Sequence, residues 1–119
     1  MNRLMCVFVI MVALFGFWRS AVSDDVASVE IEYLLESVGH SGCVFIRNGS
    51  EHSSEDAESH LRLKYRNGKK WAKSAELFIK RLATKSSWTK KAYYLRCEGE
   101  SRQPVAQWLK ARLANYRGV

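Results

Sequence analysis

Apolar residues recur near the start of the chain at the spacing of one helix face. Within the segment 26–38, Ile31, Leu34, Leu35 and Val38 stand at positions i, i+3, i+4 and i+7, and this periodicity predicts an amphipathic helix. The opposite face is rich in glutamate, so we expect it to be exposed to solvent. A glycine follows directly, and it is the expected end of the helix.

Two short runs of β-branched and aromatic residues predict strands. The first run covers residues 43–47 and ends at an Asn-Gly dipeptide, which favours a tight turn. The second covers residues 92–97 and contains two adjacent tyrosines. We expect these two runs to form a minor two-stranded element.

A longer stripe at helical spacing follows the first strand. It consists of Leu61, Tyr65, Gly68, Ala72, Ala75, Ile79 and Leu82. Ser53 or Ser54 is the expected cap at its start, because acidic residues fill the next turn. The small residues in the middle would let another element approach closely, and the Asn-Gly pair near position 68 and the cap candidate Ser74 mark a possible break. We expect the lysine and arginine residues along one flank of this stripe to be exposed to solvent.

The last predicted element is a helix near the C-terminus. Pro104 suits a first helical position, and an apolar face runs through Val105, Trp108, Leu109, Arg112 and Tyr116. The whole pattern predicts a mainly α fold of the α+β class, with about four helices, the two-stranded element and one disulfide. No repeat or linker divides the chain.

The N-terminus has a pattern typical of an exported protein. Arg3 precedes an uncharged apolar run at 4–18, which is shorter than the roughly twenty residues of a membrane-spanning helix. Ala21 and Ser23 fit the small-x-small cleavage pattern just before Asp24.

This pattern predicts that residues 1–23 are a cleaved signal peptide and that residues 24–119 form a single small domain. We then expect a periplasmic location and no transmembrane span in the mature chain. The alternative is an uncleaved anchor, held at its far end by Arg19.

The cysteine count agrees with export. Cys6 would leave with the signal peptide, which reduces three cysteines to two. An exported chain meets an oxidising compartment, so we expect a disulfide between Cys43 and Cys97. Closing a loop of a little over fifty residues stabilises a fold by about 4 kcal/mol. Two free thiols, or one catalytic cysteine, are the alternative.

Several segments together resemble the YfeK-like family of small exported bacterial proteins. They are Ile31-Glu32-Tyr33-Leu34-Leu35, the run from Ser41 to Gly49, His60-Leu61 with Lys64, Ser86-Ser87 leading to Tyr94 and Cys97, and Trp108-Leu109 with Tyr116-Arg117. The resemblance spans essentially the whole mature chain. It implies a Gram-negative periplasmic address and this overall layout, but no reaction, because the family is a domain of unknown function. The chain departs from the family where we expect a glycine, near Lys90.

The matched motifs contain one group of polar residues that could form a site. The group is Arg47, Asn48, Glu51, His60, Lys64, Ser86 and Ser87. If their segments converge, they would form a pocket with positive donors for a carboxylate or phosphate. In the structural alternative, Arg47 and Asn48 fix a turn, Glu51 pairs with Arg47 or Lys64, and the serines cap a helix end.

The sequence favours catalysis less than binding. No catalytic residue, metal site or cofactor is predicted, since His40, His52 and His60 lack the spacing of metal ligands. The alternative function is a small cell-envelope hydrolase that pairs His60 with Ser86 or Ser87.

The charges suggest an anionic partner. The net charge is +7, and the basic residues concentrate after position 60, where aromatic residues lie among them. An exported chain is not expected to bind nucleic acid, so an acidic protein surface or an anionic envelope component is the expected partner. The alternative is a solvated face around the core. We expect a noncatalytic binding or interaction module for an anionic ligand or acidic partner.

Overall fold

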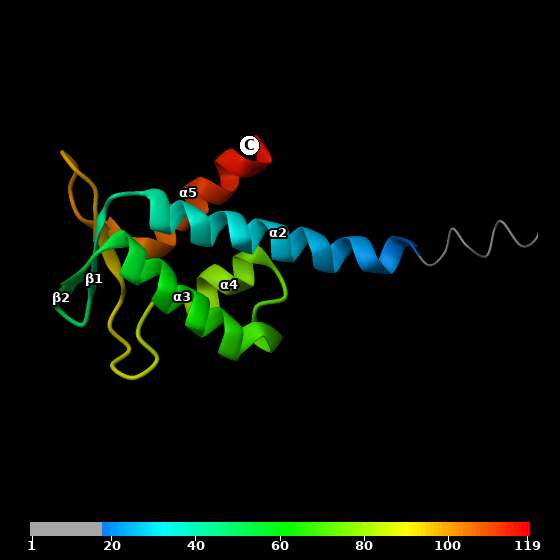
Figure 1. Ribbon diagram of the computed structural model, residues 1–119, viewed down its shortest axis with the longest axis horizontal. Coiled ribbons are helices and arrows are strands. Elements are labelled where there is room, and N and C mark those ends of the chain that lie inside the picture. Colours follow the sequence, from blue (N-terminus) through cyan, green and yellow to red (C-terminus); the bar gives the residue numbers. More distant parts are fainter. Residues whose placement is uncertain (1–17) are drawn as a thin grey trace, which may run out of the picture.

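The computed structural model describes residues 18–119, which form four α-helices and one four-stranded sheet (Figure 1). The helices are α2 (Trp18–His40), α3 (Ser54–Gly68), α4 (Ala75–Leu82) and α5 (Val105–Arg117), and a 3-10 turn, η1 (Lys69–Trp71), lies between α3 and α4. The strands are β1 (Val44–Arg47), β2 (Ser50–His52), β3 (Tyr94–Arg96) and β4 (Gln103–Pro104). The sheet covers one end of the helical bundle.

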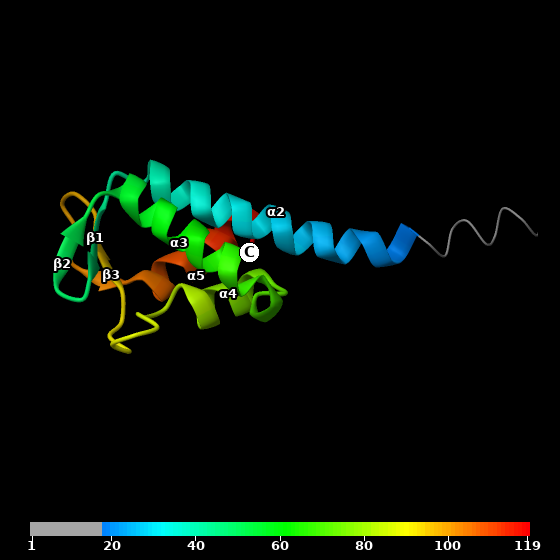
Figure 2. The same ribbon diagram turned by 60° about the horizontal axis from the view of Figure 1, so that its bottom comes forward.

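The core lies between the helices. The predicted face of α2 is fully confirmed, because its four apolar residues, Ile31, Leu34, Leu35 and Val38, are all buried. Helix α5 packs against both α2 and α4 (Figure 2). Its buried residues are Val105, Trp108, Leu109 and Leu113, whereas Arg112 and Tyr116 of the predicted face are exposed.

The long stripe is divided into two helices, as the Asn-Gly pair near position 68 and the cap candidate Ser74 predict. Ser53 caps α3 and accepts a hydrogen bond from the amide of Asp56, and Ser74 caps α4 and accepts one from the amide of Leu77. Gly68 ends α3 against Leu82 of α4, and a Cβ atom at this position would lie 2.9 Å from the leucine side chain. The small residue therefore permits the close approach of the two helices.

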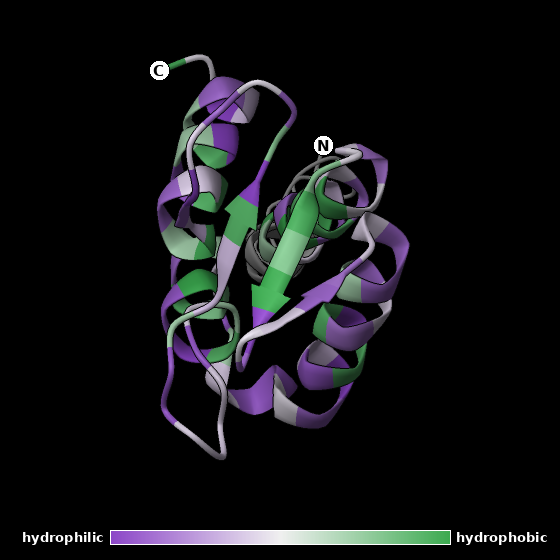
Figure 3. Ribbon diagram, turned by 90° about the vertical axis from the view of Figure 1, so that its left-hand side faces the viewer, coloured by the Kyte–Doolittle hydropathy of each residue, from purple (hydrophilic) through white to green (hydrophobic). Residues whose placement is uncertain are grey.

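The predicted two-stranded element was wrong, because the sheet has four strands in the order β2-β1-β3-β4. All neighbouring pairs are antiparallel. Strand β1 is hydrophobic, whereas β2 beside it is hydrophilic (Figure 3). Strands β2 and β4 have no apolar alternation, since backbone pairing with β1 and β3 defines them, and a sequence pattern cannot show this.

The end of α2 and the start of α5 also differ from the prediction. Helix α2 continues past Gly39 to His40, and Gly39 instead lies where an added Cβ would collide with the side chain of Glu58. Pro104 lies one position earlier than expected, as the residue that caps α5.

Cys43 and Cys97 form the predicted disulfide. Cys43 directly precedes β1 and Cys97 directly follows β3, and these two strands pair with each other. The bond therefore braces the two central strands of the sheet, as the sequence suggested.

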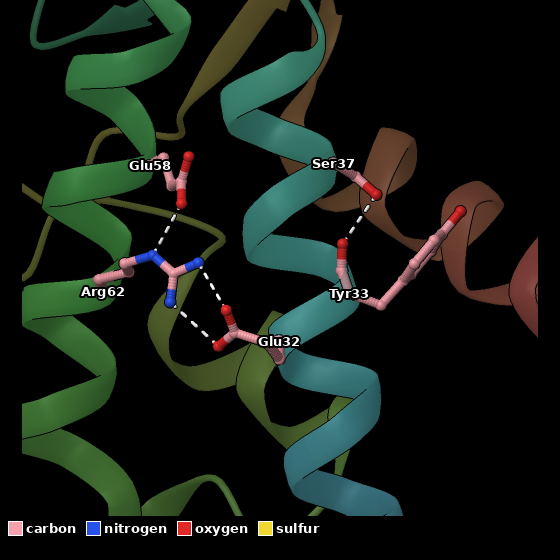
Figure 4. A network of polar contacts seen from close by, with 5 residues as sticks. All are labelled: Glu32, Tyr33, Ser37, Glu58 and Arg62. Atoms are coloured by element: carbon pink, nitrogen blue, oxygen red, sulfur yellow. Dashed lines mark hydrogen bonds and ion pairs between the residues drawn. The ribbon is translucent and has the colours of Figure 1, made fainter.

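Two arginines hold α2 to the rest of the bundle, and we call these contacts the arginine clamps. Arg62 of α3 donates two hydrogen bonds to Glu32 of α2, at 3.0 and 2.7 Å, and one to Glu58, at 2.7 Å (Figure 4). Arg117 of α5 donates to Glu30 of α2 at 2.6 and 2.7 Å and to Glu76 of α4 at 2.6 Å. Each guanidinium thus pairs with two carboxylates.

Most of the expected signal peptide lies outside the described residues. Its last part, residues 18–23, belongs to α2. None of the helices in the described range 18–119 is long and apolar enough to cross a membrane.

Candidate functional site

Arg47 is placed by the hairpin between β1 and β2. Asn48 and Gly49 form the two-residue turn of this hairpin, and both have positive φ angles, 52° and 78°. This conformation is the one that an Asn-Gly dipeptide favours in tight hairpins. The turn fixes Arg47 as the last residue of β1, next to α3.

The Arg47 guanidinium contacts a histidine instead of an acid. Its Nη1 atom lies 2.6 Å from Nδ1 of His60. A guanidinium has only donors, so Nδ1 of His60 must be the acceptor and the proton of the neutral ring must be on Nε2. That Nε2 lies 3.2 Å from the hydroxyl oxygen of Tyr93, to which it therefore donates.

Lys64 completes the chain of contacts from the next turn of α3. Its ammonium group donates to the Tyr93 hydroxyl oxygen at 3.1 Å and to the backbone carbonyl of Lys85 at 3.0 Å. We call Arg47, His60, Lys64 and Tyr93 the donor cluster. In each hydrogen bond between its members, the acceptor is an uncharged atom, either Nδ1 of His60 or the hydroxyl oxygen of Tyr93.

The donor cluster shifts the pKa values of its members. Burial lowers the pKa of His60 to about 4, and the neighbouring charges of Arg47 and Lys64 add to this effect. Burial also lowers the pKa of Lys64 to about 8, assisted by the positive charge of Arg47. The pKa of the Tyr93 hydroxyl is raised by burial. His60 is therefore neutral at pH 7, and Lys64 is held close to its titration point.

The cluster opens onto a cleft of about 290 Å³. The cleft is lined by Phe45, Ile46, Arg47, His52, Asp56, Ala57, His60, Leu61, Tyr93 and Val105. These residues come from β1, β2, α3, the segment before β3 and the start of α5. The cleft therefore has apolar walls together with three members of the cluster.

The structure brings only some of the predicted site residues together. Arg47 and His60 line the cleft, and Lys64 reaches it through Tyr93. Asn48 is exposed and accepts a hydrogen bond from Thr89, so it ties the hairpin to the following loop. The expected pairing of Glu51 with Arg47 or Lys64 is not found, because Glu51 pairs across the sheet with Arg96 at 3.1 Å.

The two serines lie away from the cleft lining. Ser86 is buried, and its hydroxyl accepts hydrogen bonds from the amides of Trp88 and Thr89. Ser87 is exposed. Both ring nitrogens of His60 already have partners in the donor cluster, so no contact in the described structure favours the pairing of His60 with a serine.

Sequence reasoning missed Tyr93 as a site residue. It was expected only as part of a strand, whereas it is the buried acceptor that joins His60 to Lys64. The available signal was its position among apolar neighbours, since a buried tyrosine hydroxyl needs a hydrogen-bond partner. His52 and Asp56 also line the cleft and were not predicted.

Metal ligands are not clustered in the part of the chain that the structure describes. No three His, Cys, Asp or Glu side chains there lie close enough to hold a metal ion.

Comparison with known proteins identifies relatives of this chain by sequence. Residues 25–117 match a family of unknown function, DUF5329. The chain is also 33% identical over 94 residues to the uncharacterized protein YfeK of Salmonella typhimurium, and the alignment covers 78% of this chain and 77% of that protein. No solved structure matches. The resemblance drawn from the sequence motifs is confirmed.

Proposed function

Because this chain belongs to the DUF5329 family of unknown function, we propose a function from its own geometry: it binds a small organic anion in the cleft beside the donor cluster, without catalysing a reaction. The anionic group of the ligand would contact Arg47 and Tyr93, and the positive charge of Lys64, which contacts Tyr93, would attract it. Its apolar body would contact the walls of the cleft.

The observation that carries this proposal is a set of donors without acidic partners. Among residues 26–119, whose side chains the structure describes, no carboxylate forms a salt bridge with Arg47 or Lys64. The Tyr93 oxygen accepts from both His60 and Lys64, so its own proton is free to donate. The N–H and O–H groups of the cluster that are not used in these contacts can therefore donate hydrogen bonds to a negatively charged acceptor.

The cleft lining supports a ligand that is partly apolar. Phe45, Leu61 and Val105 contribute hydrocarbon surface to the same cleft as Arg47. Sites for small molecules commonly combine such walls with a few polar groups that set orientation. One carboxylate, that of the exposed Asp56, also lines the cleft, and it would disfavour ligands with an extended negative charge.

The cleft lining also supports binding without catalysis. No serine, threonine or cysteine is among the residues that line it, so these three types of nucleophile are absent from this part of the described chain. His60 acts as an acceptor for Arg47 and a donor to Tyr93, and both roles orient the neighbouring groups.

Isothermal titration with phenyl phosphate at pH 6.5 tests this function, with benzyl alcohol as the uncharged control. We expect phenyl phosphate to bind and benzyl alcohol not to bind detectably. Arg47→Gln should weaken binding by about 10- to 100-fold, because it removes a charge-assisted hydrogen bond. Binding should also weaken above pH 8, as Lys64 loses its proton.

Arg66→Gln is the matched control, since Arg66 is an exposed arginine on α3, the helix that carries His60 and Lys64. It should leave the affinity within about twofold, as expected of a screened surface charge. Equal losses in the two variants would show only a general charge effect and would contradict a specific site. Binding of benzyl alcohol as tight as that of phenyl phosphate would also contradict the proposal.

The proposed setting is the periplasm, after cleavage of residues 1–23. The apolar N-terminal run and the cleavage pattern support this address, and a disulfide is compatible with it. Intact mass measurement on protein recovered from a Gram-negative host tests it. We expect a chain that starts at Asp24 and lacks free thiols, whereas an intact N-terminus with two free thiols would contradict export.

A further inference from the structure

The loop that joins α4 to β3 is closely tied by its own hydrogen bonds. Lys85 and Ala92 pair at its base. The Ser86 amide donates to the carbonyl of Lys91 at 2.9 Å, and the Lys90 amide donates to the carbonyl of Ser86 at 3.1 Å. The Ser86 hydroxyl accepts from two further amides. We call residues 85–91 the tryptophan loop.

This ordered loop presents a large aromatic side chain to solvent. Trp88 is 95% exposed, whereas Trp108 in the core is 6% exposed. Lys90 adopts a φ of 63°, a conformation that is unfavourable for lysine and suits glycine. The loop therefore contains an unfavourable backbone conformation at Lys90. Its tryptophan side chain is not packed against the rest of the protein.

Three lysines share the loop with Trp88. Lys85, Lys90 and Lys91 are all exposed, and the chain has no acidic residue between Glu76 and Glu98. None of the three lysines forms a salt bridge within the described range. An anionic surface would complement this charge.

From these features we infer that the tryptophan loop docks on the surface of a membrane that contains anionic lipids. Tryptophan favours the interface between headgroups and hydrocarbon, where its ring is buried and its N–H group stays wet. Nearby lysines add attraction to anionic headgroups. A single exposed aromatic residue in a loop with three lysines fits this flat, deformable partner better than a protein, because a protein interface needs a wide complementary patch.

Sedimentation with lipid vesicles tests the inference on the folded protein. The vesicles contain phosphatidylglycerol and phosphatidylcholine in a 1:2 ratio, and pure phosphatidylcholine vesicles are the control. We expect binding to the anionic vesicles alone, weakening as salt is added. Replacing Lys85, Lys90 and Lys91 by glutamine together should lower the partition coefficient by roughly a hundredfold, at about fivefold for each lysine.

Trp88→Ala should lower the partition coefficient by about tenfold, because it removes the inserted ring. Trp71→Ala is the matched control, since Trp71 is 49% exposed and lies against Lys70, whose ammonium is 4.3 Å from its ring centre. It should bind like the parent protein. Lipids with brominated chains should quench tryptophan fluorescence in the parent protein and much less in Trp88→Ala.

Three outcomes would overturn the inference. The first is equal binding by the parent protein and Trp88→Ala, and the second is a larger loss in Trp71→Ala. The third is retention by immobilised polyglutamate without binding to the anionic vesicles, which would assign the loop to an acidic protein partner. Arg47→Gln should leave vesicle binding unchanged, so this test is separate from that of the cleft.

Discussion

Arg62 and Arg117 each bind two carboxylates, whereas Arg47 contacts a neutral histidine. Both clamp arginines lie between helices, and their partners come from α2, α3 and α4. Arg47 lies at the end of a strand beside a cleft, and its partner His60 carries no charge at pH 7 because its pKa is about 4. The same type of side chain is thus neutralised in one region and left without a counter-charge in the other.

The difference separates charges that hold the fold from charges that are available to a ligand. In the clamps, the carboxylates satisfy the guanidinium groups and fix α2 against its neighbours. In the donor cluster, the mutual repulsion of Arg47 and Lys64 is tolerated, and a bound anion would relieve it. The comparison predicts that removing a clamp arginine lowers stability, whereas removing Arg47 mainly lowers affinity.

The largest expected effect comes from removing the disulfide that joins β1, the strand that carries Arg47, to β3. Replacing both Cys43 and Cys97 by alanine should lower the free energy of unfolding by about 4 kcal/mol, because the bond links residues 54 positions apart. Urea denaturation of the parent and variant proteins measures this loss. A change below about 1 kcal/mol would show that the sheet holds Arg47 without the disulfide.

The clamp variants give the next largest effects on stability. Arg62→Gln should lower the free energy of unfolding by about 1 kcal/mol, since its ion pairs are partly exposed. Arg117→Gln should cost more than this, because Glu30 has a side chain only 8% exposed and would lose its partner. Arg47→Gln should cost the least of the three.

Thermal and urea unfolding of these three variants, measured side by side, sharpens the comparison. If Arg47→Gln destabilises the protein as much as Arg117→Gln does, the donor cluster has a structural role and the distinction fails.

The last prediction is a pH dependence of stability. Since the pKa of His60 falls from 6.5 to about 4 on folding, the unfolded chain holds a proton between these values that the folded protein lacks. Stability should therefore fall as the pH is lowered from about 6.5 to 4.5. His60→Asn, whose amide oxygen can still accept from Arg47, should flatten this slope.

Above pH 4.5, the effect of His60 on stability can be measured separately from that of the arginine clamps. The pKa values of Glu30 and Glu32 lie below 4.5, mainly because Arg117 and Arg62 donate hydrogen bonds to them. Their contribution to stability is lost only at lower pH. Identical slopes in the parent protein and His60→Asn would rule out the shifted histidine.

Parts of this structure could be predicted because local chemistry determines them. The apolar face of α2 follows from helical periodicity, and the breaks around α3 and α4 follow from the caps Ser53 and Ser74. The disulfide follows from the cysteine count together with the expected export. The Asn-Gly turn was also visible, although the polar strand β2 that follows it was not, because backbone pairing alone defines that strand.

The candidate site was only partly predictable for a similar reason. Arg47, His60 and Lys64 belong to matched motifs, and they do come together. Asn48 and Glu51 belong to the same motifs, but their side chains contact Thr89 and Arg96 instead. Tyr93 joins the cluster through a contact between residues 33 positions apart, and one sequence contains no periodic signal for such a contact.

The most direct test of the unmatched donor cluster is an NMR titration of the His60 ring with and without saturating phenyl phosphate. The account predicts a ring protonated on Nε2 at pH 7, a pKa near 4 in the free protein, and a higher pKa when the anion is bound. A pKa at or above 6.5 in the free protein, or one that phenyl phosphate leaves unchanged, would contradict it.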